Sequence, residues 1–139
     1  MRINKPAIVL VRPQLPENIG MVARAMNNFA LNELIIVNPR SGWINDKSIN
    51  AAKKANNIIN KAKVYDTIND ALRSFTFVIA TTNRKRFLNK KKTNNFKDIF
   101  KLINTHKKTA IMFGPENSGL SNEDLRLANI IFSINTNDS

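Results

Sequence analysis

Two short segments of the chain combine glycine with side chains that bind anions or move protons. The first is PENIGMVARAM, which contains Asn18, Gly20 and Arg24. A planar guanidinium suits bidentate contact with phosphate, and a helix N-terminus beside it would add free N–H groups, so Asn18 and Arg24 could hold a phosphate or a ribose. The same positions also suit a helix cap at Asn18 and an exposed surface arginine. The residues of this segment alone leave both interpretations open.

The second segment is FGPENSGL, in which Gly114 and Gly119 bracket the carboxylate of Glu116. Gly114 would let the backbone approach a ligand closely, Gly119 would permit a positive φ at a turn, and the following Ser121 is a favourable N-cap. A plain loop between a strand and a helix, with Glu116 exposed, explains these residues too. No GxGxxG or GxxxxGK[ST] pattern occurs, so a dinucleotide-binding or P-loop site has little support.

A third segment, residues 81–92, is the densest basic stretch of the chain. It begins with Thr81 and Thr82 and continues through Arg84, Lys85 and Arg86. Such a loop binds phosphate backbones if it becomes ordered on RNA, although lysines and arginines used in this way read little sequence. A solvated loop is the alternative.

The overall composition favours a polyanionic partner. The 139 residues carry 22 Lys and Arg against 10 Asp and Glu, a formal net charge of +12, which would attract nucleic acid through counterion release. A biased composition with lysines on solvated surfaces is the competing explanation. There is no cysteine and only one histidine, so we expect no metal site. With no long apolar run and no signal-peptide core, we expect a soluble, cytoplasmic protein with no membrane partner.

Hydrophobic patterning predicts alternating strands and helices. Apolar, β-branched runs predict strands at residues 7–11, 34–37, 64–65, 75–80, 109–113 and 130–134. Helical spacing of apolar residues predicts helices at 17–30, 48–62, 67–73, 96–103 and 121–128. This order predicts an α/β fold with a mainly parallel sheet covered by helices on both faces. Ligands then bind beyond the carboxyl ends of the strands, where the three segments fall.

Taken in order along the chain, the segments resemble the SpoU-type branch of the SPOUT methyltransferases. That family's first motif, N-x-G-x-x-x-R, is similar to Asn18, Gly20 and Arg24. Its second motif, G-x-E-x-x-G-L, is similar to Gly114, Glu116, Gly119 and Leu120. The segments NFALNELIIVNP, ATTNRKR and SNEDL most resemble the tRNA branch, which methylates an anticodon-loop ribose, and next the enzymes that act on ribosomal RNA.

The resemblance implies a specific fold, cofactor and assembly. Family members have a parallel α/β sheet whose C-terminal segment threads a trefoil knot, a rare exception among folds. They bind S-adenosylmethionine in the knot and work as homodimers with the active site at the interface, so Arg24 would act across the dimer. The residues that would line the cofactor site here are Thr81, Thr82, Gly114, Glu116, Gly119, Leu120 and Ile134.

The activity that the resemblance implies is transfer of a methyl group to a ribose 2′-hydroxyl of RNA. Arg24 would contact the target phosphate and 2′-hydroxyl, Asn18 would orient it, and Glu116 would brace the site. Arginine is too basic to be an ordinary base at neutral pH, so its help in proton removal is a debated role. Arg84, Lys85 and Arg86 would contact the RNA, which we expect to be tRNA.

One family feature is missing from this chain. A third motif, S-L-N, and a final helix follow the last strand in family members, whereas this sequence ends with residues 135–139, NTNDS. We therefore expect residues 1–139 to form a single methyltransferase domain without that motif and helix, and to be a piece of a longer protein. The alternatives are a degenerate, non-catalytic RNA-binding module and an enzyme that acts on ribosomal RNA.

Overall fold

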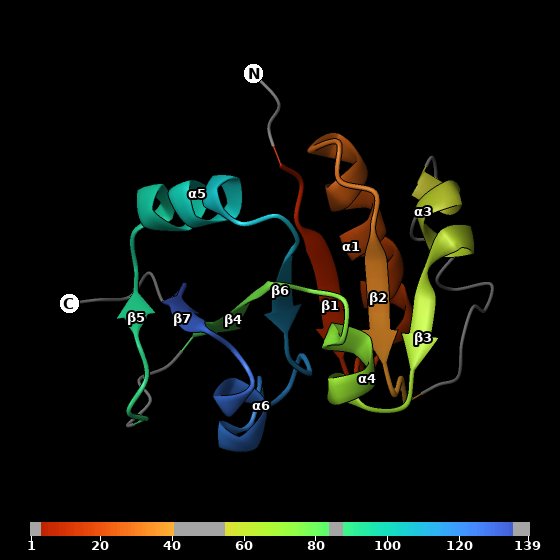
Figure 1. The fold of residues 1–139 in the computed structure, drawn as a ribbon. Helices are drawn as coiled ribbons and strands as arrows, with labels where there is room; N and C mark the ends of the chain where they lie inside the picture. Colours follow the sequence, from red (N-terminus) through yellow and green to blue (C-terminus); the bar gives the residue numbers. More distant parts are fainter. Residues whose placement is uncertain (1–3, 41–54, 84–87, 135–139) are drawn as a thin grey trace.

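The protein folds around one parallel β-sheet. The computed structural model describes residues 4–40, 55–83 and 88–134, and in these ranges a seven-stranded sheet has the order β3-β2-β1-β6-β4-β7-β5 (Figure 1). Every pairing between neighbouring strands is parallel. The strands are β1 (Ala7–Val11), β2 (Leu34–Val37), β3 (Lys63–Tyr65), β4 (Phe77–Thr82), β5 (Lys92–Thr93), β6 (Thr109–Phe113) and β7 (Ile130–Ser133).

Helices cover both faces of this sheet, because its strands are apolar on both sides. In β1, Ile8 and Leu10 pack under α1 and α3 on one face, whereas Val9 and Val11 pack toward α4 and α6 on the other. The helix α5 lies on the same face as α1, over Ile79 of β4 (Figure 1). The described helices are α1 (Pro16–Asn28), α3 (Asn56–Lys61), α4 (Ile68–Leu72), α5 (Phe96–Thr105) and α6 (Asn122–Arg126). The predicted α/β fold with a parallel sheet is confirmed; the trefoil knot stays a prediction.

Two predicted boundaries in the basic segment are wrong. Thr81 and Thr82, expected in a loop, are the last residues of β4 and are buried, since β-branched threonines suit an inner strand. Lys92 and Thr93 form β5, an unpredicted two-residue edge strand paired with β7. Hydrophobic patterning could not reveal β5, because neither residue is apolar. The predicted helix 48–62 lies partly outside the described residues, and α3 is its described part.

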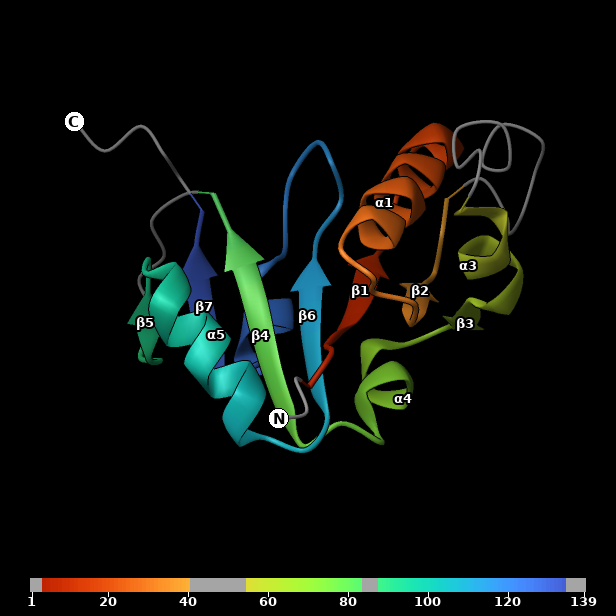
Figure 2. The same ribbon diagram turned by 90° about the horizontal axis from the view of Figure 1, so that it is seen from above.

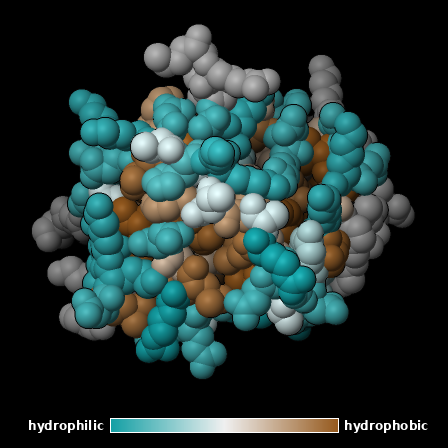
Figure 3. Space-filling model, viewed as in Figure 1, coloured by the Kyte–Doolittle hydropathy of each residue, from teal (hydrophilic) through white to brown (hydrophobic). Residues whose placement is uncertain are grey.

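The face of the molecule in Figure 3 has an apolar centre. Figure 3 shows hydrophobic side chains gathered toward the middle of one face, with hydrophilic side chains around them. None of the described helices is both long and apolar enough to cross a bilayer.

Candidate active site at the carboxyl ends of the strands

Four neighbouring strands bring the loops of the candidate site to one edge of the sheet. The inner strands β1, β6, β4 and β7 are adjacent and parallel, so their carboxyl ends lie at the same edge, and Figure 2 shows the β6–α6 loop extending beyond it. The loops that carry the first and second sequence motifs follow β1 and β6. These strands pair directly, with Leu10 opposite Phe113. Segments about a hundred residues apart in sequence are therefore side by side.

Glu116 joins the two loops by hydrogen bonds. Its carboxylate accepts from the backbone N–H of Gln14, at 3.1 and 3.2 Å to its two oxygens, and from the N–H of Leu15 at 3.0 Å. Leu15 is the N-cap residue of α1 and its own side chain makes no capping bond. A carboxylate at this position satisfies free N–H groups and lies at the positive end of the helix dipole. Glu116 therefore caps α1 from another loop.

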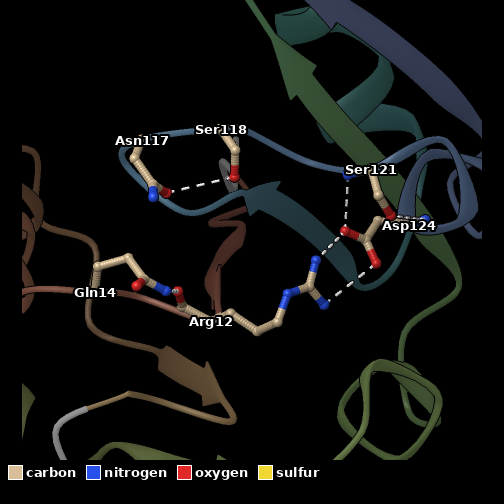
Figure 4. A network of polar contacts seen from close by, with 6 residues as sticks. All are labelled: Arg12, Gln14, Asn117, Ser118, Ser121 and Asp124. Carbon is tan, nitrogen blue, oxygen red and sulfur yellow. Dashed lines mark hydrogen bonds and ion pairs between the residues drawn. The ribbon is translucent and has the colours of Figure 1, made fainter.

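A second, charged contact joins the same two loops. The guanidinium of Arg12, just after β1, forms an ion pair with Asp124 in the first turn of α6, and both guanidinium NH2 groups donate to the carboxylate (Figure 4). Asp124 also accepts from the backbone N–H of Ser121 at 2.9 Å, while the Ser121 hydroxyl accepts from the N–H of Asp124. Ser121 and Asp124 thus form a capping box that is fastened to β1.

The environment of Asp124 favours its ionised form. Burial alone would raise the pKa of this carboxyl, but the hydrogen bonds from Arg12 and Ser121 and the positive charge of Arg12 outweigh burial, so the pKa lies below its ordinary value of 3.8. The side chain of Asp124 is only 8% exposed, and that of Arg12 is 37% exposed. The pair is therefore held close to the surface with one partner largely out of water.

The glycines of the β6–α6 loop are required by its own backbone. A Cβ atom at Gly114 would lie 2.2 Å from the backbone nitrogen of Leu120 and 2.3 Å from the carbonyl carbon of Gly119. Gly119 has a φ of +72°, as the sequence predicted. Gly114 thus approaches the backbone of its own loop closely, and its approach to a ligand stays a prediction. Both glycines fold the loop back on itself, which places Glu116 at its tip.

The two loops border an apolar groove between α1 and the sheet. It has a volume of about 390 Å³. Asn18, Gly114 and Glu116 lie at its polar end. The residues that form its apolar wall include Ile8, Leu10, Ile19, Val22, Met26, Phe29 and Phe113.

Arg24, the predicted catalytic arginine, does not line this groove. It is exposed in the middle of α1. Asn18 is inside that helix, which begins at Pro16, so a capping role for Asn18 is wrong. In the part of the chain that the structure describes, no hydrogen bond joins Asn18 to Arg24. One copy of the chain therefore brings Asn18, Gly114 and Glu116 together and leaves Arg24 apart.

The remaining predicted cofactor residues lie at the carboxyl ends of β4 and β7 and in the loop after β6. The hydroxyl of Thr81 donates to the carbonyl of Met112 at 2.8 Å, which ties β4 to β6. The N–H of Ile134 donates to the carbonyl of Thr82 at 2.8 Å, and the side chain of Ile134 is exposed at this edge. Leu120 is buried in the core, so its side chain packs inward. Thr82 and Ile134 are thus adjacent.

Other predicted residues cannot be placed, and one contact was not predicted. Arg84, Lys85 and Arg86 lie outside the described residues. Within the described ranges, no group of three His, Cys, Asp or Glu residues could hold a metal ion. The Arg12–Asp124 pair was missed: the S-x-x-D pattern at 121–124 could have indicated the capping box, but nothing in the sequence connects it to Arg12.

A comparison with protein families finds one match over nearly the whole chain. The model of the SpoU rRNA Methylase family matches residues 5–139.

Individual relatives agree with this match. The chain is 33% identical over 135 residues to the tRNA (cytidine-2′-O-)-methyltransferase TrmJ of Methanocaldococcus jannaschii, covering 95% of this chain and 58% of the relative. It is 31% identical over 129 residues to the tRNA (cytidine/uridine/adenosine-2′-O-)-methyltransferase TrmJ of Pseudomonas aeruginosa, covering 89% and 49%. The crystal structure of TrmJ from Z. mobilis ZM4 superposes with a TM-score of 0.89 at 41% identity, covering 95% of this chain and 59% of that chain. This chain therefore spans about half the length of its relatives.

Proposed function

Because this chain belongs to the SpoU rRNA methylase family, we propose that it is the catalytic domain of an S-adenosylmethionine-dependent RNA 2′-O-methyltransferase. The substrate we propose is tRNA, since the Methanocaldococcus and Pseudomonas relatives are named as enzymes that methylate tRNA riboses. We place the reaction in the cytoplasm, where tRNA is modified. A ribosomal RNA substrate is the second candidate, because the family's description names rRNA.

The observation that carries this proposal is the joining of the two motif loops by Glu116. A single carboxylate binds the N–H groups of Gln14 and Leu15 and so sets the start of α1, the helix that carries Asn18 and Arg24. Transfer of a methyl group needs the donor and the 2′-hydroxyl to be aligned within a narrow range of positions. A rigid junction between the two motifs would supply that alignment.

The residues at the carboxyl ends of β4, β6 and β7 fit the cofactor in chemical kind. Ile134 presents an exposed apolar side chain beside the backbone of Thr82. In the folded-back loop from Gly114 to Gly119, Glu116 is the one charged residue, and its carboxylate is bound by the N–H groups of Gln14 and Leu15. Such a surface suits an uncharged adenosyl group held by backbone hydrogen bonds. We propose that Thr81, Thr82, Gly114, Glu116, Gly119, Leu120 and Ile134 form this site. When bound, S-adenosylmethionine would supply an electrophilic methyl group on its sulfonium.

Arg24 is proposed to act on the RNA from the partner subunit of a homodimer. Its side chain is exposed and lies outside the groove of its own chain, whereas Asn18 and Glu116 line that groove. Met21, three residues before Arg24 on α1, is exposed as well, and a second copy would cover it. In this arrangement the guanidinium binds the phosphate beside the target ribose and stabilises charge that develops on the 2′-oxygen. Asn18 orients it.

Methyl transfer from labelled S-adenosylmethionine to tRNA tests this proposal. In the full-length protein, Arg24→Ala should reduce transfer at least about 100-fold, as expected for removal of a group that stabilises transition-state charge. The thermal midpoint should stay unchanged, because Arg24 is exposed. Arg73→Ala, a second exposed arginine on the opposite face, is the matched control and should retain activity.

The same assay separates the alternatives. Mass spectrometry of the digested product identifies a 2′-O-methylnucleoside, and parallel reactions with tRNA and ribosomal RNA identify the substrate. Unchanged transfer by Arg24→Ala would refute its role. Binding of RNA without binding of S-adenosylmethionine by the full-length protein would favour a non-catalytic RNA-binding module.

A further inference from the structure

Helix α5 carries two aromatic side chains that are largely exposed. Phe96 and Phe100 are 76% and 61% exposed, while Ile99 between them is buried against the sheet. Residues four apart lie one turn above each other on a helix, so the two rings form a short row. Two large apolar side chains left in water on one helix face mark an interaction surface.

A row of positive charge runs beside these rings. Lys97 and Lys101 follow Phe96 and Phe100 by one residue each, are exposed, and line a shallow hollow with them. Lys91, just before the edge strand β5, is exposed as well. Aromatic and basic side chains therefore alternate on one surface, which we call the α5 surface and define by Phe96, Lys97, Phe100 and Lys101.

The α5 surface adjoins the carboxyl edge of the sheet. The ring of Phe96 packs edge-on against that of Phe132, with 5.1 Å between ring centroids. Phe132 is the third residue of β7, two positions before Ile134, whose N–H is bound to Thr82. An RNA strand that crosses the proposed site can thus continue onto α5.

We propose that the α5 surface binds an unpaired segment of the RNA substrate, with bases stacked on Phe96 and Phe100 and phosphates on Lys97 and Lys101. The inference rests on the proposed function, which makes RNA the substrate. Bases have apolar faces and the RNA backbone is anionic, so the alternation of rings and ammonium groups matches single-stranded RNA in both respects. An apolar protein partner would match the rings and leave the lysines without a role.

Equilibrium binding of fluorescent tRNA to the full-length protein tests the α5 surface without requiring methyl transfer. The double variant Phe96→Ala/Phe100→Ala should raise the dissociation constant about tenfold or more, as loss of base stacking predicts. Phe96→Tyr/Phe100→Tyr should restore affinity, because tyrosine also stacks. The double variant Lys97→Ala/Lys101→Ala should lower the slope of log affinity against log salt by about two.

The matched controls lie at the opposite edge of the sheet. Lys61→Ala/Lys63→Ala removes two exposed lysines near β3, and Val64→Ala removes an exposed apolar side chain; both should leave RNA affinity within about twofold. Unchanged affinity in the double phenylalanine variant would overturn the proposal even if methyl transfer is active. A change in its oligomeric state without a change in RNA affinity would overturn it too, and would assign the surface to a second copy of the chain.

Discussion

The junction of the β1–α1 and β6–α6 loops differs sharply from the α5 surface, although both lie near the carboxyl edge of one sheet. At the junction, Glu116 and Asp124 each bind groups of the other loop, and Asp124 is buried as well. On α5, Phe100 and Lys101 project outward. Residues that must hold a reacting geometry are fixed by neighbours, whereas residues proposed to bind a flexible polymer are left exposed.

The two regions also differ in how far their positive charge is neutralised by a neighbouring carboxylate. The excess of positive charge is not uniform, since Arg12 is neutralised by Asp124 while Lys97 and Lys101 lie in the exposed α5 surface. A half-buried pair whose charges cancel adds little to long-range attraction, whereas exposed lysines contribute to it directly. Substitutions in the two regions should therefore act on different measurements.

The largest effect on stability is expected at Gly114. Gly114→Ala would place a Cβ within 2.3 Å of two backbone atoms of the same loop, and backbone cannot move aside as a side chain can. We expect a loss of about 3 kcal/mol or more in the free energy of unfolding, measured by urea denaturation. Gly119→Ala is the matched control: it has open space but a positive φ, so it should cost only about 1 kcal/mol. Equal losses of unfolding free energy in the two variants would show that the β6–α6 loop can open to accommodate a Cβ atom at Gly114.

An intermediate effect is expected from Arg12→Ala. The variant leaves the carboxylate of Asp124 buried without its partner, but Arg12 is partly exposed and water can reach the site, so we expect a loss of about 1 to 3 kcal/mol at neutral pH. Arg73→Ala removes an exposed ion pair with Asp70 and should cost a few tenths of a kcal/mol at most.

The pH dependence of that loss gives a second test. The pKa of Asp124 is lowered in the folded state, so the stabilisation is present above its ordinary value of 3.8 and is lost as the pH falls through the folded-state pKa. The difference in unfolding free energy between the wild type and Arg12→Ala should therefore be largest near neutral pH and shrink below about pH 4. A difference that is constant with pH would contradict the ionic account.

Much of the fold was predictable from sequence, because it depends on local patterns. Runs such as AIVLV and LIIV are apolar on both faces, which predicts buried parallel strands, and β1 and β2 have the predicted bounds. The edge strand β5 was not predictable, since Lys92 and Thr93 pair with β7 through their backbone alone. The order of the strands in the sheet was not predictable either, because it depends on contacts between segments that are distant in sequence.

The candidate site also contains some features that the sequence predicts and others that it does not. The positive φ of Gly119 and the cap at Ser121 are local properties and were predicted correctly. The contacts of Arg12 with Asp124 span 112 residues and leave no periodic signal. The groove beside Asn18 depends on how α1 docks on the sheet, which no spacing of residues determines.

A smaller effect on stability is expected from Glu116→Gln, and this variant should separate the two regions most clearly. The amide keeps the size of the side chain but loses the charge at the α1 N-terminus and one of two accepting oxygens, so we expect a loss of about 0.5 to 1 kcal/mol. Methyl transfer should fall about tenfold, because the start of α1 is no longer fixed in the position that the reaction requires.

Phe100→Ala provides the opposite result in the same assays. Its ring is exposed, so its removal should change the unfolding free energy by less than about 0.5 kcal/mol and weaken tRNA binding. Glu116→Gln should leave tRNA affinity near the wild-type value while lowering the rate at saturating RNA. If Glu116→Gln instead weakened RNA binding and left the rate unchanged, the junction would serve binding rather than alignment, and the difference drawn between the two regions would not hold.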